Sequence, residues 1–371
     1  MQTNQSSEQP VGPQVGTNLG VQPGAQAGNQ ANPQAEAKQP AFNSASVQSA
    51  ADLITAKLGL EKIEGFSLKA FFSEVFSKHP SDEVENLFTV GSTITTPALH
   101  PSMGNLPSPW LFFRVFVGAI LVYFLFLLSW NEYGNIHVIP GLIIVGSFAV
   151  PLSVLVLFYE INTPRNVSIV RVIQMLVFGG ALSIFLSLVL FQVTPFLGVF
   201  GDSAAGIVEE VGKLLTVLFA MRLIPMARYR YRINALLLGA AVGAGFAAFE
   251  SAGYALRLGL SSPDAMLNNI TLRGAMSPFA HIVWTAIATS AYWIVRPKHD
   301  SFGATVTSKE FLLLFSAPVG LHFVWNLPFQ GPFLVKFWML GFVAWVIIFS
   351  LIISALKEVA SLAGGRQPGP A

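Results

Sequence analysis

The chain lacks cysteine altogether and carries few charged residues. Without cysteine it cannot form a disulfide bond, a thiolate zinc site or a cysteine nucleophile. Charged residues make up 11% of the sequence, whereas soluble domains typically carry about 25%. Hydrophobic residues make up 53%, and 31 of the 371 residues are Phe. This composition predicts a protein that is surrounded by lipid rather than by water.

A strong charge imbalance is also absent. The net charge is +2, and the chain has no block of basic residues of the kind that binds nucleic acid, so no nucleic-acid partner is expected. The first apolar run comes after residue 100, which argues against an N-terminal signal peptide.

The composition changes along the chain and divides it into four parts. Residues 1–45 are rich in Gln, Gly, Pro and Asn and are expected to form a disordered tail, because they cannot bury enough apolar area to offset the entropy of ordering. Residues 46–109 are expected to form a short cytoplasmic segment of amphipathic helix and linker, because apolar residues recur at helical spacing from Leu68 to Phe76. This segment is interpreted as a packing module beside the membrane, with a lipid-surface anchor as the alternative. Residues 358–371 are expected to be a cytoplasmic tail.

Between residues 110 and 357, apolar stretches long enough to cross a bilayer follow one another. A helix needs about 20 residues for this, at a rise of about 1.5 Å per residue. The stretches predict an all-α fold, a polytopic membrane bundle of about eight transmembrane helices. We place these helices at residues 111–130, 138–159, 168–192, 203–223, 233–256, 277–295, 310–328 and 333–356.

Basic residues favour one end of these predicted helices. The connections after the second, fourth and sixth helices carry most of them, and the connection after the fourth is the richest, with Arg222, Arg228, Arg230 and Arg232. Because basic loops remain on the cytoplasmic side, the bias predicts a multi-pass protein of the cell membrane with both termini in the cytoplasm.

The fourth predicted helix carries charges that it cannot leave outside the membrane. Only eight residues separate Lys213 from Arg222, which is about 12 Å of helix against a hydrocarbon thickness of about 30 Å. Glu209, Glu210 and Lys213 therefore lie in or against the bilayer, where each charge costs about 2.5–3.5 kcal/mol unless it is paired or hydrated. Glu209 and Lys213 are four residues apart and can pair on one helix face. The alternative to a functional site is an interfacial ion pair at the end of a short helix.

Three further predicted helices carry polar residues at a similar level. Glu250 lies near the end of the fifth helix, His281 near the start of the sixth, and His322 and Asn326 share one face of the seventh. Each alone is more typical of a residue that hydrogen-bonds a neighbouring helix. In the predicted orientation, however, all of them fall in the outer half of the bundle, with Glu250 about 9 Å below the outer boundary. The sequence therefore predicts a buried polar cluster in the outer half of the bundle.

Such a cluster is suited to three kinds of function. Two adjacent carboxylates cannot both ionise at low cost, so one can act as a general base toward water while His and Asn donors stabilise an oxyanion. A metal is the second option, since His281, His322 and Glu250 form a ligand set of the type used for catalytic zinc, although the chain has no His-Glu-x-x-His helix. A proton- or ion-coupled transporter is the third, but a cluster confined to one leaflet favours an active site.

These residues, in this order on successive helices, resemble the PrsW-type intramembrane proteases, which belong to the superfamily of CAAX-prenyl endopeptidases and bacteriocin-immunity membrane proteins. The likeness covers roughly residues 110–356. The motifs that carry it are Glu209-Glu210-x-x-Lys213, Phe246-x-x-x-Glu250, His281 and His322-x-x-x-Asn326. The resemblance implies regulated proteolysis of a membrane-anchored protein, such as a regulator of the anti-sigma-factor type.

The resemblance also implies roles for single residues. Glu209 or Glu210, with Glu250, would activate water, and His281, His322 and Asn326 would stabilise the oxyanion. Lys213 and Phe246 would support them.

Two positions depart from the family patterns. Asn326 stands where PrsW-type members usually have Asp, and Glu250 stands where the prenyl-endopeptidase branch has His, which argues against prenyl-endopeptidase chemistry. We therefore expect a glutamate-type intramembrane endopeptidase that cuts a membrane-tethered protein near the extracytoplasmic face. No cofactor is expected, with zinc as the alternative. A transporter or an immunity-type membrane protein without hydrolytic activity is the alternative from another class.

Overall fold

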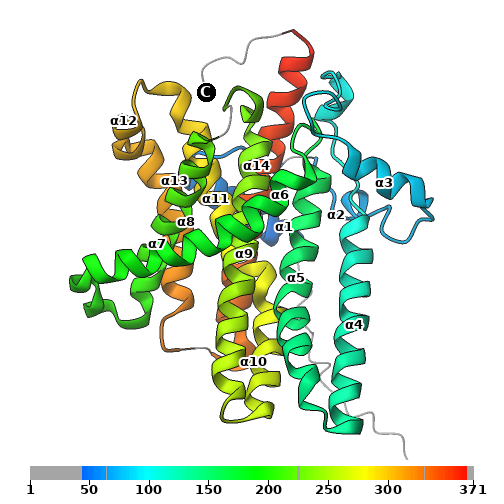
Figure 1. The fold of residues 1–371 in the computed structure, drawn as a ribbon. Helices are drawn as coiled ribbons and strands as arrows, with labels where there is room; N and C mark the ends of the chain where they lie inside the picture. Colours follow the sequence, from blue (N-terminus) through cyan, green and yellow to red (C-terminus); the bar gives the residue numbers. More distant parts are fainter. Residues whose placement is uncertain (1–43, 64, 224–225, 330, 366–371) are drawn as a thin grey trace, which may run out of the picture. The chain divides into compact units, whose positions relative to one another are not determined.

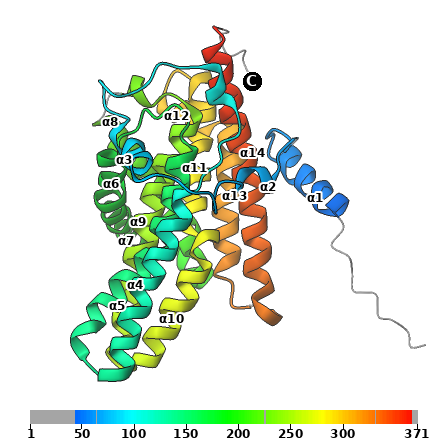
Figure 2. The same cartoon turned by 90° about the vertical axis from the view of Figure 1, so that its right-hand side faces the viewer.

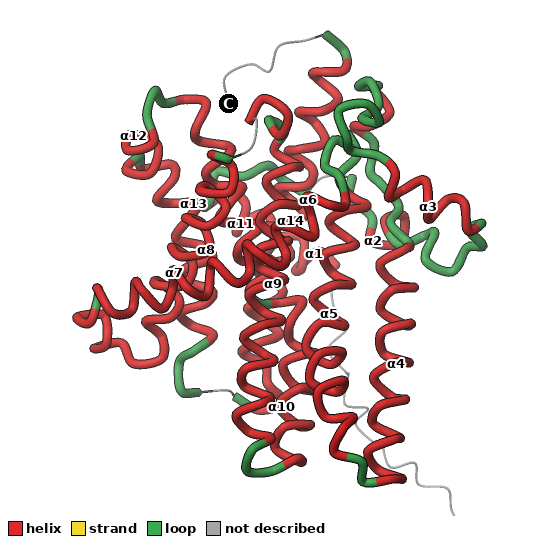
Figure 3. The backbone as a smooth tube through the Cα atoms, viewed as in Figure 1, coloured by secondary structure: helices red, strands yellow, loops and turns green. Residues whose placement is uncertain are grey.

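The computed structural model describes residues 44–63, 65–223, 226–329 and 331–365. Within these ranges the chain forms helices joined by turns and loops, and it contains no strand (Figure 3). The predicted all-α fold class is confirmed. The predicted disordered tail lies outside the described residues up to residue 43, and the predicted C-terminal tail is described only to Gly365.

Fourteen α-helices follow one another along the described residues (Figure 1). The first three are short and precede the apolar part of the chain: α1 Ser44–Lys57, α2 Leu68–Phe71 and α3 Ser81–Thr89. The others are α4 Leu111–Tyr133, α5 Ile139–Ile161, α6 Ile169–Gln174, α7 Gly180–Val193, α8 Ala205–Arg222, α9 Arg232–Gly259, α10 Pro263–Met276, α11 His281–Val295, α12 Phe302–Thr307, α13 Lys309–Trp325 and α14 Val335–Ala363.

Six helical stretches among the described residues are long and apolar enough to cross a membrane. They are Leu111–Tyr133, Ile136–Ile161, Ile169–Val193, Arg232–Gly259, Pro263–Lys298 and Pro332–Ala363. The fourth and seventh predicted spans correspond to α8 and α13 and do not meet this criterion, because α8 carries four charged residues and α13 has 17 residues. The predicted count of eight spans is therefore not confirmed.

The hairpin of α4 and α5 is fixed by a carboxylate. Glu160, near the end of α5, accepts hydrogen bonds from the backbone N–H groups of Trp110, Leu111 and Phe112, at 2.8, 2.8 and 2.9 Å. These are N–H groups that the first turn of a helix cannot satisfy itself, and a negative charge there also matches the helix dipole. The contact explains why α4 begins at this point.

The segment that precedes α4 packs against the apolar helices. The rings of Phe66 and Phe71 lie 4.4 and 6.0 Å from that of Phe349 in α14, and the Tyr159 hydroxyl of α5 donates to the carbonyl of Leu87 at 2.9 Å. These contacts favour the packing module over the lipid-surface anchor.

One apolar stretch runs across the others. α6 and α7, joined by a π-helical turn at Met175–Gly179, cross the direction of α4 and α5 in Figure 1, and the rotated view of Figure 2 shows them nearly end-on. A π-helical turn is a common cause of a bend in a helix. The predicted third span is thus helical over almost its predicted length, but it does not run parallel to its neighbours.

The apolar helix at the centre of the bundle is α9, which packs against α5, α7, α10 and α11. In its most apolar window 89% of the residues are buried, against 6% for α4, which therefore faces the lipid. Glu250 lies nine residues before the end of α9, about 14 Å of helix rather than the expected 9 Å.

A helix not expected from the sequence, α10, follows α9. Its start carries recognisable signals: Ser262 Oγ accepts a hydrogen bond from Ala265 N at 3.2 Å, Pro263 occupies the first position, and Asp264 lies in the first turn. α10 continues into α11, so that His281 lies near the middle of a candidate span rather than near its end. His281 thus lies about half-way along this helical stretch, whereas the sequence predicts it near the start of a helix.

Candidate active site

A buried lysine lies at the centre of the polar residues. Lys213 Nζ, on α8, is 2.7 Å from Glu210 Oε1, 3.4 Å from Glu209 Oε2 and 2.9 Å from His281 Nδ1, and its side chain is completely buried. The Phe246 ring of α9 lies under the ammonium group, with its centroid 4.2 Å from Nζ. Lys213 therefore pairs with both acids of its own helix and also reaches α11.

Each histidine of the cluster pairs one ring nitrogen with a carboxylate. His322 Nδ1 is 2.9 Å from Glu210 Oε1, and His281 Nε2 is 3.1 Å from Glu250 Oε2. The second nitrogens face a common point: His322 Nε2 is 3.9 Å and His281 Nδ1 is 4.0 Å from Glu209 Oε2. This Glu209 oxygen is buried and has no hydrogen-bond partner among the described residues.

Close helix packing holds these side chains together. At Gly206 in α8 and Gly243 in α9 an added Cβ would collide with the backbone of α13 and α11 respectively, next to His322 and His281. Glycine allows helices in a membrane protein to approach this closely. The indole of Trp284 stacks on His322 with the ring centroids 4.4 Å apart and fixes the ring from the other side.

Two partners of the cluster were not identified from the sequence. Arg273 of α10 forms an ion pair with Glu250 and donates to Ser251 Oγ at 2.9 Å. Arg273 falls between the predicted helices at residues 233–256 and 277–295, and only the helix signals at Ser262–Asp264 indicate that it lies in a helix. Trp284 gave no signal, because an aromatic residue in an apolar helix is ordinary.

Asn326 lies at the edge of the site rather than within the cluster. It is the C-cap residue of α13, and its Nδ2 donates to the carbonyl of Asp202 at 3.2 Å, in the turn that precedes α8. It also lines a polar cavity of 420 Å³ together with Glu209, Glu250, His281 and His322. All six predicted site residues are thus accounted for: five border the cavity, while Glu210 is fully buried behind it.

Three of these residues can hold a metal ion. Glu209, His281 and His322 each offer one ligand atom, and the three atoms lie within 4.8 Å of one another. The donor set suits zinc, and each imidazole bears a carboxylate on its other nitrogen, as metal-binding histidines usually do. The Glu209 Oε2 atom, which accepts no hydrogen bond from the described residues, also fits a role as ligand. The metal set predicted from the sequence shares both histidines, but here Glu209 takes the place of Glu250.

The position of Lys213 argues against a metal ion at this site. Its Nζ is 2.9 Å from His281 Nδ1, so an ammonium group and a metal ion would compete for the same nitrogen. Lys213 already supplies a positive charge to Glu209 and Glu210, which is what a site without metal would require.

Comparison with known proteins gives one match. Residues 167–352, half of the chain, match the sequence model of the PrsW family intramembrane metalloprotease. Neither the curated proteins nor the solved structures include one that matches.

Proposed function

The chain belongs to the PrsW family of intramembrane proteases, and from this membership and the geometry of its site we propose that Glu209 is the residue at the reacting centre. The observation that carries the proposal is its Oε2 atom, which is buried, accepts no hydrogen bond from the described residues, lies 3.4 Å from Lys213 Nζ and is faced by a ring nitrogen from each of two histidines. The other two carboxylates of the cluster differ: Glu210 is hydrogen-bonded to Lys213 and His322 and does not line the polar cavity, and Glu250 is paired with Arg273 and His281.

In the proposed reaction, Glu209 takes a proton from a water molecule in the polar cavity, and this water attacks the peptide carbonyl of the substrate. When the tetrahedral intermediate collapses, the C–N bond breaks and Glu209 returns the proton to the leaving amine. Asn326 and, when its ring carries both protons, His322 border the same cavity and donate to the oxyanion that forms, while His281 accepts from the Lys213 ammonium through Nδ1 and holds it beside Glu209. Glu210 acts through His322, whose ring it orients, and Glu250 acts in the same way on His281.

The metal-dependent alternative uses the same centre. A zinc-type ion held by Glu209, His281 and His322 would supply Lewis-acid chemistry, and the family description favours it. Glu210 and Glu250 would then fix the tautomers of the two ligating histidines.

The proposed substrate is a membrane-anchored protein, for example a regulator of the anti-sigma-factor type, cut near the extracytoplasmic face. The polar cavity is lined by the start of α8, the second half of α9 and the end of α13. These are the helix portions remote from the Arg-rich connection between α8 and α9, which the positive-inside rule assigns to the cytoplasm. Both termini would accordingly be cytoplasmic.

The test is cleavage of a single-span model substrate by the purified protein in detergent. Glu209→Gln is expected to lower the turnover about 10²- to 10⁴-fold, as loss of a general base does, while the protein still folds. Glu132→Gln, at the exposed end of α4, is the matched control and should retain full activity. Full activity of Glu209→Gln would refute the proposal.

A chelator distinguishes the two mechanisms. Activity that persists in its presence supports glutamate-activated water, and activity that is lost and returns with added zinc supports the metal. Mass spectrometry of the new termini locates the cut, and a cut on the cytoplasmic flank would contradict the proposed orientation.

A further inference from the structure

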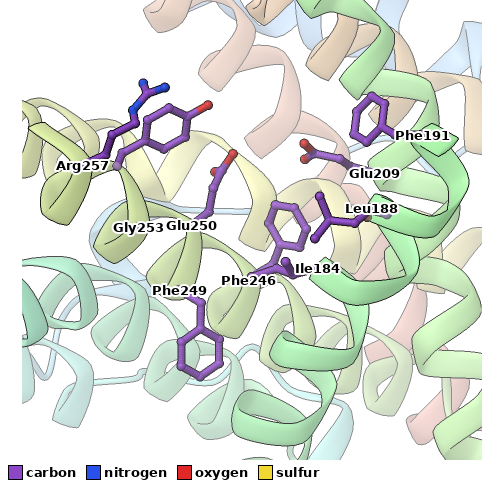
Figure 4. A pocket seen from close by; sticks show the side chains of 11 residues that line it. Ile184, Leu188, Phe191, Glu209, Phe246, Phe249, Glu250, Gly253 and Arg257 are labelled. Carbon is purple, nitrogen blue, oxygen red and sulfur yellow. The ribbon is translucent and has the colours of Figure 1, made fainter. Parts of the chain in front are cut away.

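A second cavity, of 390 Å³, adjoins the site between α7 and α9. Figure 4 shows the carboxylates of Glu209 and Glu250 turned toward the same space, with Leu188 and Phe191 of α7 on one side and Phe246 of α9 below. Glu209 and Glu250 line the polar cavity as well, so the two cavities meet at the proposed reacting centre.

The walls of this second cavity are apolar and reach the surface that faces lipid. Leu188 is 60% exposed and Phe191 is 36% exposed, and 28% of the residues in the most apolar window of the α7 stretch are buried. The cavity is therefore open toward the bilayer between α7 and α9, at a point where a membrane-spanning segment can reach the carboxylates from the side.

A glycine leaves room in the wall on the α9 side. Gly253 lines the cavity, and no atom lies within 4 Å of the position where its Cβ would be. A larger side chain at this position would project into open space without displacing a neighbour. The cavity thus owes part of its volume to a residue whose size can be changed without disturbing the helix packing.

We propose that this cavity is the subsite for one large apolar side chain of the substrate, next to the scissile bond, and that the substrate segment enters from the bilayer between α7 and α9. The inference rests on the proposed function, because it assigns the peptide bond to Glu209. A cavity of this size with apolar walls has room for a Leu or Phe side chain, whereas an Ala side chain would fill little of it and add little binding free energy. One methylene in a hydrophobic pocket changes kcat/KM by about 10- to 200-fold, so the larger difference between Leu and Ala predicts a preference of at least about tenfold.

The experiment uses two single-span model substrates that differ only in carrying Leu or Ala at the cleaved position. The wild-type protein is expected to prefer Leu by at least about tenfold. Gly253→Leu fills the cavity and should lower this Leu-over-Ala ratio by about tenfold or more, and Gly253→Ala should lower it less. Gly118→Leu is the matched control, since Gly118 in α4 is exposed and also has open space around its Cβ position, and it should keep the wild-type ratio.

The possible failures are distinguishable. If the wild type cleaves both substrates equally, or if Gly253→Leu keeps the wild-type ratio while Glu209→Gln is inactive, the subsite is wrong and the proposed function stands. An equal loss on both substrates in Gly253→Leu also contradicts the subsite, because it indicates a blocked site rather than a filled pocket. If the wild type cleaves neither substrate, both the proposed function and the subsite fall.

Discussion

At the scale of single residues, the two adjacent acids of α8 differ in what surrounds them. Glu210 is fully buried and hydrogen-bonded on one oxygen to Lys213 and His322, whereas Glu209 lines both cavities and its Oε2 accepts no hydrogen bond from the described residues. Adjacent residues on a helix point about 100° apart, which follows from 3.6 residues per turn, and this separates their surroundings. We infer that Glu210 mainly stabilises the site and that Glu209 reacts.

This difference gives a prediction for stability. Lys213→Met leaves Glu210 as a buried carboxylate without its cation, and breaking a buried ion pair from one side typically costs about 3–5 kcal/mol. The thermal unfolding temperature in detergent should therefore fall clearly for Lys213→Met, while Glu209→Gln should change it little. A Lys213→Met protein as stable as the wild type would show that the ion pair is not needed for folding. Lys298→Met, which removes an exposed ion pair with Glu310, serves as the control.

The members of the cluster and the Glu209–Lys213 pair within α8 could be predicted from the sequence, but the pairing between helices could not. Glu209, Lys213, His281 and His322 stand out because each is a polar residue within an apolar helix, where such residues are costly. Which histidine binds which carboxylate depends on the rotation of the helices and on packing at a few glycines. Asn326 illustrates the difference, since it shares a helix face with His322 but donates to Asp202.

At the scale of the helices, the long apolar stretches of the sequence predicted the helix ends well, whereas a helix of mixed polarity was missed. The ends of α4, α5 and α9 lie within three residues of those predicted, because about 20 consecutive apolar residues leave few alternatives. α10 was missed because its residues are mixed in polarity and its length is only 14 residues. With it, Arg273 was missed as the partner of Glu250, since that contact links two helices and has no signature in the sequence.

Two glycines of α9 provide a prediction at this scale. Gly243→Ala places a methyl group against the backbone of α11, and overpacking of this kind typically costs about 1–3 kcal/mol. Gly253→Ala on the same helix adds the same methyl in open space, where a gain in helix propensity is all that is expected. Thermal unfolding should therefore show a lower midpoint for Gly243→Ala alone. Equal midpoints would mean that α9 and α11 can move apart without a loss of stability.

At the scale of the whole chain, the charge bias predicts which side of the membrane each connection occupies. The turn between α8 and α9 carries Arg228 and Arg230, while the turn between α9 and α10 carries neither Arg nor Lys. Reporter fusions after Arg232 and after Pro263 should therefore report the cytoplasm and the exterior respectively. If both reported the same side, α9 would not cross the membrane, and the proposed position of the site near the extracytoplasmic face would be wrong.

The crossing course of α7 has a consequence for the lipid itself. A 25-residue apolar stretch that runs across the bundle covers less of the bilayer thickness than the same stretch standing upright, so we expect the acyl chains beside it to shorten or bend. We expect this compression where the apolar cavity opens, and a substrate helix that moves into a thinner bilayer would have its ends drawn out into the headgroups. Unwinding near the cut is thereby made easier, and the rate of proteolysis in liposomes should rise as the lipid tails are shortened.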